Sequence, residues 1–434
     1  MPPTLQILIA GMQAPLRAHH LAVDVTVLNA QNGVPQDVGP SSVAGVISYD
    51  DPGTTPPAGS GDFGFYTQSL KVGFFGSVVT SFNAEVGLQA NRLFGRPAAL
   101  EFVKDDPKYP DTFTIKGVYH LIAGVATVSF QLQEARVFDF PTGASLPGGA
   151  MPRILSQFKI TQASILPQAS TGPVNGITTE QAQITLAGAL WFAADPFAAG
   201  IDLFSYGAGD TGLTLDNFGL EMTFQLDAQG QRVPNSVVLD VDYSRLAVSA
   251  TADAVRPGAL LAGLPLTLKG ILADDDGLDT GKLGGKPVHV LQIAGKETDT
   301  PHFALQFELI IGSLGELSGV HAGLTAEMRL AWGPLATTPD ADGALLTVQL
   351  PGASGGFDGL NVQGMLQLVF GDANLMKVDY KAGNTSVYAL LFNNVALSIM
   401  GIKLPPKVVS DLILFSDPKN AASSSLAACL AVMQ

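Results

Sequence analysis

The segment Gln183-Ile184-Thr185-Leu186-Ala187-Gly188-Ala189-Leu190-Trp191-Phe192 shows the pattern that decides the fold of this 434-residue chain. Apolar side chains alternate with polar or small ones, as in a strand with one buried face and one solvated face. The same two-residue period returns throughout the chain, for example in Ser69–Phe75, Phe113–Tyr119, Gly219–Leu226, Phe303–Ile310, Leu324–Trp332 and Val395–Ile402. We therefore predict strands almost from one end of the chain to the other.

Short turns separate these predicted strands. Asn32-Gly33, Asp342-Gly343 and Gly383-Asn384 are pairs of residues that accept a positive φ in tight turns. Strands joined by such short connections pair antiparallel, because a parallel crossover needs a dozen or more residues. The predicted fold class is all-β: an extended antiparallel meander that forms bent or curved sheets, or tandem β-sandwich-like domains.

Few segments have a helical pattern. Asp253–Leu261 is long enough for one or two turns. Over residues 423–434 we predict a short C-terminal helix, because serines suited to an N-cap precede apolar residues that share one helical face, namely Leu426, Cys429, Leu430 and Met433. Near the other end, the apolar run Ile7–Ala10 is too short for the core of a secretory signal and is interpreted as a strand.

Two stretches rich in Pro and Gly suggest a domain division. The first, residues 33–64, is interpreted as a loop of an N-terminal β-domain that spans residues 1–150. The second, Pro141–Pro152, leads into a C-terminal β-region, residues 151–434, which ends in the predicted helical tail. Alternatively, both regions belong to one continuous sheet structure.

The charge balance excludes several partners. The chain has 23 Lys and Arg against 38 Asp and Glu, a formal net charge of −15, and no basic residue from Ile160 to Gln231. Nucleic acid needs clustered Lys and Arg to displace counterions, so it is excluded as a partner. Anionic membrane surfaces are disfavoured for the same reason. No run of apolar residues is long enough for a transmembrane helix.

The cysteine content and the N-terminal segment indicate the cellular compartment. Cys429 is the single cysteine, which excludes an intrachain disulfide and a thiolate metal cluster. The N-terminus has no basic segment ahead of its apolar run. Together these features predict a cytoplasmic protein.

A weak internal repeat places a glycine inside four predicted strands. The pattern apolar-x-apolar-x-Gly-apolar/Ala occurs around Gly117, Gly188, Gly270 and Gly364, at a spacing that drifts along the chain and so excludes a strict solenoid or propeller. Glycine within a strand permits a bulge, a sharp bend or the close approach of another backbone. Four such bends would curve the meander into a trough or a sandwich. Chance is the alternative, because the chain contains 48 glycines.

The sequence identifies no catalytic, cofactor-binding or metal-binding set, and we predict no cofactor. The six histidines have no zinc-site spacing. Gly207–Gly212 matches GxGxxG but does not open a helix, so it is interpreted as a turn. Asp274, Asp276 and Asp279 form a weak Ca²⁺ candidate, since Ca²⁺ prefers oxygen-rich loops. The EF-hand spacing and its final Glu are missing, which favours a solvated acidic hairpin tip.

These observations favour a non-catalytic structural or interaction protein. We predict a subunit of a larger assembly that pairs through sheet edges or faces with itself or with another protein subunit. The first alternative is a carrier that holds a lipid-like or other apolar small molecule between curved sheets. The second is a carbohydrate-binding or carbohydrate-active β-sandwich protein. Trp191 and Trp332 would be its sugar platforms, although tryptophans at strand positions more often belong to the core.

Overall fold

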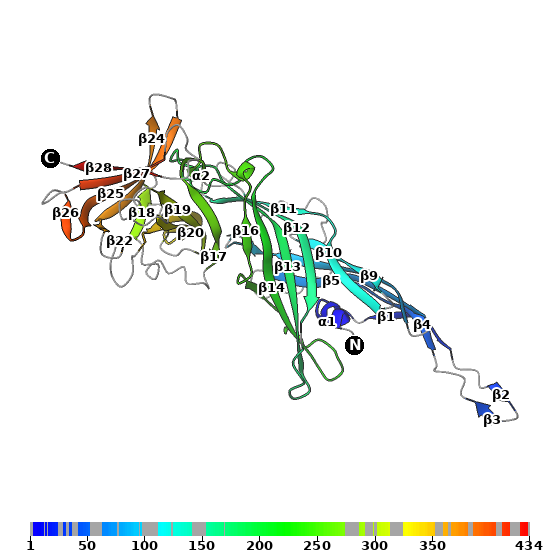
Figure 1. Ribbon diagram of the computed structural model, residues 1–434. Helices are drawn as coiled ribbons and strands as arrows, with labels where there is room; N and C mark the ends of the chain where they lie inside the picture. Colours follow the sequence, from blue (N-terminus) through cyan, green and yellow to red (C-terminus); the bar gives the residue numbers. More distant parts are fainter. Residues whose placement is uncertain are drawn as a thin grey trace. The chain divides into compact units, whose positions relative to one another are not determined.

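The structure is a computed structural model, and it is nearly all strand (Figure 1). The helical segments of its described part are α1 (Pro3–Ala10), the 3₁₀ turn η2 (Ala252–Ala254) and α2 (Leu260–Gly263). The predicted all-β class is confirmed. The described residues are 3–12, 14, 16–24, 29–31, 34–36, 42–52, 63–75, 78–94, 96–97, 112–122, 125–140, 153–168, 170–273, 286–290, 298, 302–312, 324–351, 359–362, 366–380, 385–404, 410–416 and 426–432.

The chain divides into two compact units. Unit 1 comprises Met1–Phe138, Lys159–Gly188 and Asp216–Arg245, and unit 2 comprises Asp139–Phe158, Ala189–Leu215 and Leu246–Gln434. Three of the five borders between these ranges fall inside long strands, namely β12 (Leu155–Pro167), β13 (Thr178–Phe192) and β14 (Leu213–Leu226). The chain leaves unit 1 after Phe138 and returns to it twice, at Lys159 and at Asp216.

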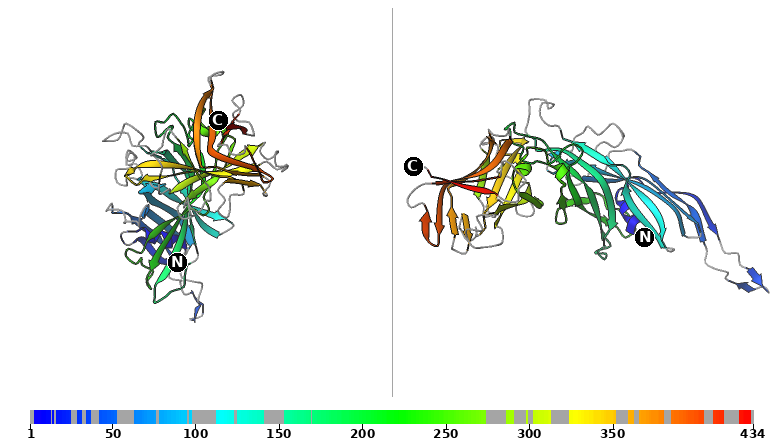
Figure 2. Two further views of the ribbon diagram at one scale, coloured as in Figure 1. Left: turned by 90° about the vertical axis from the view of Figure 1, so that its left-hand side faces the viewer. Right: turned by 45° about the horizontal axis from the view of Figure 1, so that its top comes forward.

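The first sheet belongs to unit 1 and is an antiparallel meander in the order β1-β4-β5-β6-β9-β10 (Figures 1 and 2). From β4 onward each strand pairs with the next long strand along the chain. Its strands are β1 (Arg17–Asp24), β4 (Ser42–Asp50), β5 (Phe63–Phe75), β6 (Val78–Ala90), β9 (Thr112–Ile122) and β10 (Val125–Leu132). Two small hairpins are formed by β2 (Asn29–Gln31) with β3 (Val34–Gln36), and by β7 (Arg92–Leu93) with β8 (Arg96–Pro97).

Part of the predicted loop over residues 33–64 is strand. β4 lies within it and pairs with β1 on one side and with β5 on the other. The segment Val43–Tyr49 is rich in β-branched residues, which favour a strand. The Pro and Gly residues around it are typical of loops, so composition did not indicate this short strand. The loop interpretation is therefore wrong for Ser42–Asp50.

The second sheet has the order β11-β12-β13-β14-β15. Its outer strands are β11 (Arg136–Asp139) and β15 (Val238–Asp242), and β16 (Ala247–Ser249) pairs with β14. Along β13, the residues of the quoted segment alternate between buried and half-buried positions up to Leu190, and Trp191 and Phe192 are also buried. The two-residue period therefore orients this strand as the sequence predicts.

The third sheet lies in unit 2 and has the order β17-β19-β20-β21-β18-β24-β25-β23-β22, with β26, β27 and β28 attached beyond β25. β18 pairs in parallel with β24, so the meander is interrupted where β18 is inserted between β21 and β24. The strands are β17 (Leu266–Ala273), β18 (Lys286–Val290), β19 (Phe303–Gly312), β20 (Leu324–Leu335), β21 (Thr338–Gln349), β22 (Gly359–Val362), β23 (Leu366–Val369), β24 (Asp372–Tyr380), β25 (Thr385–Ile399), β26 (Ile402–Leu404), β27 (Ser410–Phe415) and β28 (Ala427–Val432).

The N-terminal run Ile7–Ala10, predicted to be a strand, belongs to helix α1. Ile7 and Leu8 are fully buried. The end of the helix is fixed to β5, because Thr67 donates its hydroxyl to Leu8 O at 2.7 Å and its backbone N–H to Gly11 O at 2.9 Å. The first bond gives Leu8 O a second donor beside the N–H of Gly11, and the second pairs the carbonyl of Gly11 just beyond the helix end. A run of four apolar residues does not distinguish a helix from a strand, and this tertiary partner decided it.

The predicted C-terminal helix over residues 423–434 is also wrong. Ala427–Val432 forms strand β28, which pairs antiparallel with β27 from Ser410↔Val432 to Phe415↔Ala427. A helix of about twelve residues is marginal by itself. The neighbouring strand offers a full row of backbone donors and acceptors, and pairing with it outweighs the weak helical pattern.

Aromatic side chains form the centre of each unit. In unit 1, Phe218 contacts Phe63, Phe94 and Tyr243 with ring centroids 5.5–6.3 Å apart. In unit 2, Trp332 contacts two phenylalanines edge-on and a third in a stacked geometry, at 5.5–5.6 Å; these are Phe192, Phe204 and Phe303. Trp332 is 2% exposed, so it belongs to the core and is no platform for a surface ligand.

Within the described ranges, no helix is both long enough and apolar enough to cross a bilayer.

The glycines of the sequence repeat have different surroundings. Gly117 in β9 is packed against the side chains of Phe82 and Phe130 on the neighbouring strands, while a Cβ added at Gly188 in β13 would collide with the backbone carbonyl of Lys159. Gly270 follows a bulge in β17, and a Cβ added there would meet open space. Gly364 lies outside the described residues. Three different local causes therefore account for the three glycines that the structure describes.

This difference predicts unequal effects of adding one methyl group. Gly188→Ala should lower the free energy of unfolding by about 3 kcal/mol, because the backbone of β12 would have to move away. Gly270→Ala is the matched control and should change it by less than about 0.5 kcal/mol. Urea denaturation followed by tryptophan fluorescence measures both. Equal effects of the two variants would contradict the close approach of β12 and β13.

Candidate functional site

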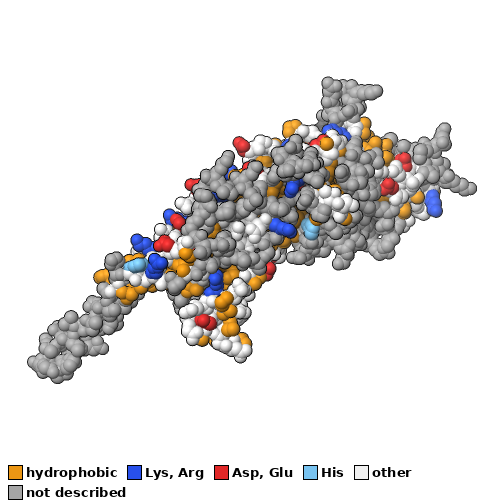
Figure 3. All heavy atoms as spheres, turned by 180° about the vertical axis from the view of Figure 1, so that it is seen from behind, with side chains coloured by type: hydrophobic (Ala, Val, Ile, Leu, Met, Phe, Trp, Pro, Cys, Tyr) orange, Lys and Arg blue, Asp and Glu red, His pale blue; other side chains and the backbone are white. Residues whose placement is uncertain are grey.

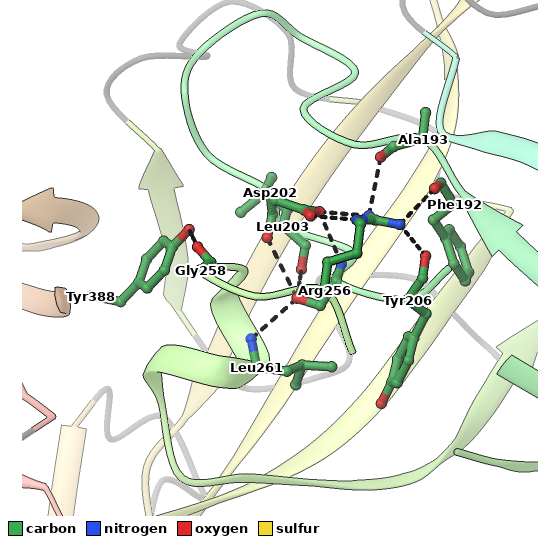
Figure 4. Close-up of polar contacts among 10 residues, drawn as sticks. Phe192, Ala193, Asp202, Leu203, Tyr206, Arg256, Gly258, Leu261 and Tyr388 are labelled. Carbon is green, nitrogen blue, oxygen red and sulfur yellow. Dashed lines mark hydrogen bonds and ion pairs between the residues drawn. The ribbon is translucent and has the colours of Figure 1, made fainter. Parts of the chain in front are cut away.

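Arg256, which follows η2, lies at the centre of a polar network in unit 2 (Figure 4). Its Nε donates to Oδ2 of Asp202 at 2.5 Å, and its Nη2 donates to Oδ1 at 2.7 Å. The two side chains are 14% and 16% exposed. Two parallel bonds between a guanidinium and a carboxylate are the strongest geometry for such a pair, so the ion pair holds the 202 and 256 segments together.

The remaining donors of the guanidinium go to backbone carbonyls. Nη1 donates to Phe192 O at 2.9 Å and to Tyr206 O, and Nη2 also donates to Ala193 O at 3.4 Å. An arginine has five N–H groups, and each one of Arg256 therefore has an acceptor within the protein. No donor is left for an external anion. The network is a structural centre and is closed to ligands.

Ser205 extends the network to helix α2. Its backbone N–H donates to Asp202 Oδ1 at 3.1 Å, and its hydroxyl donates to Leu203 O at 3.2 Å and accepts the N–H of Leu261 at 3.1 Å. Ser205 has a φ of +62°, which non-glycine residues rarely adopt. Local bonds of this kind to a short polar side chain stabilise that conformation.

Tyr388 on β25 is hydrogen-bonded to the segment between Arg256 and helix α2. Its hydroxyl donates to Gly258 O at 3.1 Å, and Lys377 Nζ lies 5.7 Å from the centre of its ring. Burial, with a smaller contribution from the negative charge of Asp202, raises the pKa of Tyr388 to about 12. Burial also raises the pKa of Tyr206 above its ordinary value. Both phenols thus remain protonated at neutral pH.

The Gly207–Gly212 motif is a turn, as the sequence analysis predicted, and the structure gives the reason for its glycines. Gly207 has a φ of +116°. Added Cβ atoms at Gly207 and Gly212 would lie 3.1 Å and 2.9 Å from indole carbons of Trp191. The glycines therefore let this turn pack directly against Trp191, and the motif does not hold a phosphate.

The sequence analysis missed the Arg256–Asp202 pair, although one signal was present. Asp202 lies in the stretch from Ile160 to Gln231 that contains no Lys or Arg. A carboxylate buried there has to recruit a cation from elsewhere in the chain. Sequence alone does not indicate which cation, because Arg256 is 54 positions away.

The acidic candidates for Ca²⁺, Asp274, Asp276 and Asp279, lie outside the described residues. Within the described part of the chain, no group of three or more His, Cys, Asp or Glu side chains has the geometry to hold a metal ion.

Three of the clefts formed by the described residues lie open on the sheets. One of about 500 Å³ lies over β17, β19, β20 and β21 in unit 2 and is lined by Lys269, Gln306, Glu308 and Glu327. The other two are in unit 1: one of about 630 Å³ extends along β10 and β12, and one of about 460 Å³ covers β1, β4 and β5 beside His19. The first two are considered further below.

Comparison with protein-family models, with curated proteins and with solved structures found no match.

Breaking the closed network should cost more stability than breaking an exposed ion pair. Arg256→Ala leaves the mostly buried Asp202 without its cation and should lower the free energy of unfolding by about 3–5 kcal/mol. Arg256→Lys should recover only part of this loss, because an ammonium cannot reach all five acceptors. Lys269→Ala, which removes an exposed pair with Glu308, is the control and should cost less than about 1 kcal/mol. Urea denaturation of the three variants tests this order.

The raised pKa of Tyr388 predicts a loss of stability in alkali. An unfolded tyrosine loses its proton near pH 10, whereas Tyr388 in the folded chain keeps its proton up to about pH 12. Stability should therefore be full below pH 10 and fall by about 2 kcal/mol between pH 10 and 12, since the unfolded state ionises first. Tyr388→Phe should reduce this fall without abolishing it, because Tyr206 remains. A variant with the same pH dependence as the wild type would refute this assignment.

Proposed function

We propose that the protein is a non-catalytic subunit that assembles with further copies of itself by pairing the open edges of its sheets. The observation that supports this most directly is that, in the described part of the chain, two edge strands, β10 and β28, lack the charges, prolines and bulges that normally prevent such pairing. Natural sheets protect their edges with charges, proline, bulges or covering segments. The edge strands of this chain differ sharply in these features.

Other edges of the sheets are protected. β1 carries Arg17 and Asp24, and its register shifts between His19 and Ala22. β17 carries Lys269 at a bulge, and β16 lies beside it. β15 contains two aspartates, and β11 and β22 have four residues each. These strands are poor templates for a second chain.

β10 is unprotected. It pairs with β9 alone among the described strands, and its sequence, Val-Ala-Thr-Val-Ser-Phe-Gln-Leu, has no charge, proline or glycine. The register from Val125↔Ile122 to Leu132↔Ile115 places Gln133 opposite Thr114, and the N–H of Gln133 donates to Thr114 O at 3.4 Å. This is therefore a hydrogen-bonded pair, and the odd-numbered residues of β10 bond to β9. The backbone N–H and C=O groups of Phe130 and Leu132 therefore point away from β9.

The cleft of about 630 Å³ leaves room beside this edge. Its walls include four consecutive residues of β10, Ser129–Leu132, and four of β12, Thr161–Ser164. β11 contacts β12 near its beginning, where Phe140 N donates to Ser156 O at 2.8 Å. Space for an added strand thus remains farther along.

β28 is the second unprotected edge. It pairs with β27 alone in the described structure, and Ala427–Val432 contains no charge, proline or glycine. β10 pairing with β10 of a second copy about a two-fold axis gives a closed dimer. β10 pairing with β28 of the next copy gives an open chain of subunits. Each arrangement completes the backbone hydrogen bonding of the two edges that it joins.

The net charge of the chain affects how strongly copies associate. Each copy carries a formal net charge of −15, so two copies repel one another at low ionic strength. On the face drawn in Figure 3, acidic and basic side chains are interspersed with neutral ones across the described surface. Salt screens the repulsion with a Debye length of about 8 Å at physiological ionic strength, and association should strengthen as salt is added.

The contacts inside unit 1 favour assembly over the carrier alternative. Helix α1 contacts β5, and Gln6 donates to Glu180 on β13 at 3.2 Å. Ile7 and Leu8 are buried there, and Phe218 is buried among the aromatic rings described above. The protein's own side chains therefore fill this part of the described interior of unit 1, which leaves little room there for an apolar ligand.

Light scattering coupled to size exclusion, over a dilution series and at several salt concentrations, tests the proposal. The expected masses exceed 45.1 kDa, rise with concentration and rise with salt. Leu132→Pro removes the outward N–H of β10 without removing a bond to β9, and it should weaken the association; Leu132→Thr keeps that N–H and is its control. Ala428→Lys places a charge on β28, with Ala428→Ser as its control.

The variants distinguish the two arrangements. Loss of all association in Leu132→Pro with no effect of Ala428→Lys indicates a dimer through β10. Weakening by both indicates an open chain. A wild-type protein that remains at 45.1 kDa at every concentration and salt level contradicts the proposal.

A further inference from the structure

The cleft of about 500 Å³ in unit 2 has a lining that is independent of the sheet edges discussed above. It covers one face of β17, β19, β20 and β21 and is bordered by the side chains of Lys269, Gln306, Glu308, Glu327 and Gln349. Its volume is within the range of small-ligand sites, about 300–1,000 Å³. All of these side chains come from paired strands, so the sheet fixes their relative positions.

The strand register arranges this face in rows. Glu308 on β19 is opposite Glu327 on β20, which is opposite Gln349 on β21. One row further along the strands, Gln306 is opposite Arg329. Residues that are directly opposite in an antiparallel pair present their side chains on the same face, so these groups form a continuous polar surface.

The charges on this surface are balanced. Two glutamates opposite each other repel, and each has a cationic neighbour. Lys269 Nζ lies 3.1 Å from Glu308 Oε2, and Arg329 Nε donates to Glu327 Oε1. Among the described residues of this surface, two positive groups are paired with two negative ones, so the pairs favour neither an anion nor a cation.

Hydrogen-bonding capacity remains on both carboxylates. Glu327 Oε1 accepts from Arg329 and from Gln306 Nε2, the latter at 3.0 Å, and Glu308 uses Oε2. Among the described residues, the second oxygen of each carboxylate has no such bond, and an ionised carboxylate can accept about four hydrogen bonds. Lys269 has further N–H donors beside them. Donors and acceptors thus alternate, which suits hydroxyl groups because each hydroxyl both donates and accepts.

An apolar row adjoins the polar rows on the same face. Leu272, Ala304, Ala331 and Leu345 are opposite one another across the four strands. Ala304 and Ala331 are buried, and Leu272 and Leu345 are half-buried against them. From this row to that of Glu308 is four residues along β19, or about 14 Å at the rise of an antiparallel strand. A ligand of that length would place C–H groups on the leucines and hydroxyl groups on the carboxylates.

We propose that this face of β17, β19, β20 and β21 binds a neutral oligosaccharide. The balanced charge disfavours a strongly ionic ligand, the alternating donors and acceptors match sugar hydroxyls, and the exposed parts of Leu272 and Leu345, next to the cleft, match C–H groups of sugar rings. Glu308, Glu327 and Gln306 contact the hydroxyls, and Lys269 donates to ring or hydroxyl oxygens. The inference concerns binding alone, and it does not depend on how the chain assembles.

Isothermal titration with cellohexaose, maltohexaose, mannohexaose and chitohexaose tests this inference on the full-length chain. At least one of these neutral sugars should bind saturably to one site per chain, with an affinity that changes little with salt. Hexagalacturonate, which is anionic, should bind more weakly. Binding of none of the four, or preference for the anionic sugar, would overturn the proposal.

Substitutions locate the site. Glu327→Ala should weaken sugar binding by about tenfold or more, because hydrogen bonds to a charged group are the stronger kind. Glu85→Ala is the matched control: Glu85 accepts a bond from Ser69 at 3.3 Å on the polar face of the unit 1 sheet, outside this cleft. Gln349→Ala is a second test of the site in case Glu327→Ala does not fold. It removes an uncharged lining group and should also weaken sugar binding. Equal binding by the wild type and by folded Glu327→Ala and Gln349→Ala variants would refute the site.

Discussion

Backbone hydrogen bonding between strands is the constraint on which this structure depends. A strand satisfies its N–H and C=O groups only through its neighbours, so each strand of the meander needs a partner on both sides or an edge that water can solvate. The side chains then divide between two faces. Aromatic clusters around Phe218 in unit 1 and Trp332 in unit 2 occupy the inner faces, while polar rows such as Glu308–Glu327–Gln349 occupy an outer one.

Counting hydrogen-bond partners in this way also distinguishes polar sites whose groups are all paired within the protein from sites that can still bond to a ligand. All five donors of Arg256 end on acceptors of the protein, so its network fixes the connection between the 202 and 256 segments and leaves nothing for a ligand. On the face of β17, β19, β20 and β21, by contrast, the carboxylates of Glu308 and Glu327 each bond through one oxygen within the described structure. At β10 and β28 the open groups belong to the backbone. Our proposals for assembly and for sugar binding rest on this remaining hydrogen-bonding capacity.

Two errors in the sequence-based prediction, at the ends of the chain, have the same physical origin. Ile7–Ala10 and Ala427–Val432 are short apolar segments with no strong local preference, and they were assigned to the wrong secondary structure in opposite directions. Thr67 fixes the end of a helix at the first, and the open edge of β27 provides a ladder for the second. Contacts distant in sequence supplied the energy in both cases. The Arg256–Asp202 pair escaped prediction for the same reason, since its two residues are 54 positions apart.

The sequence alone determined that the chain is pleated and largely antiparallel, because a two-residue period with turn residues between the segments allows one buried face per strand and short connections. It also determined the acidic charge and the absence of basic clusters. Tertiary structure decided which strands become neighbours, as in the parallel insertion of β18 beside β24, and which edges remain open. It also decided which carboxylates meet a cation and which face a cleft. Alternation specifies the face on which a side chain lies but carries no information about the strand beside it, and pairing between distant segments supplies that information.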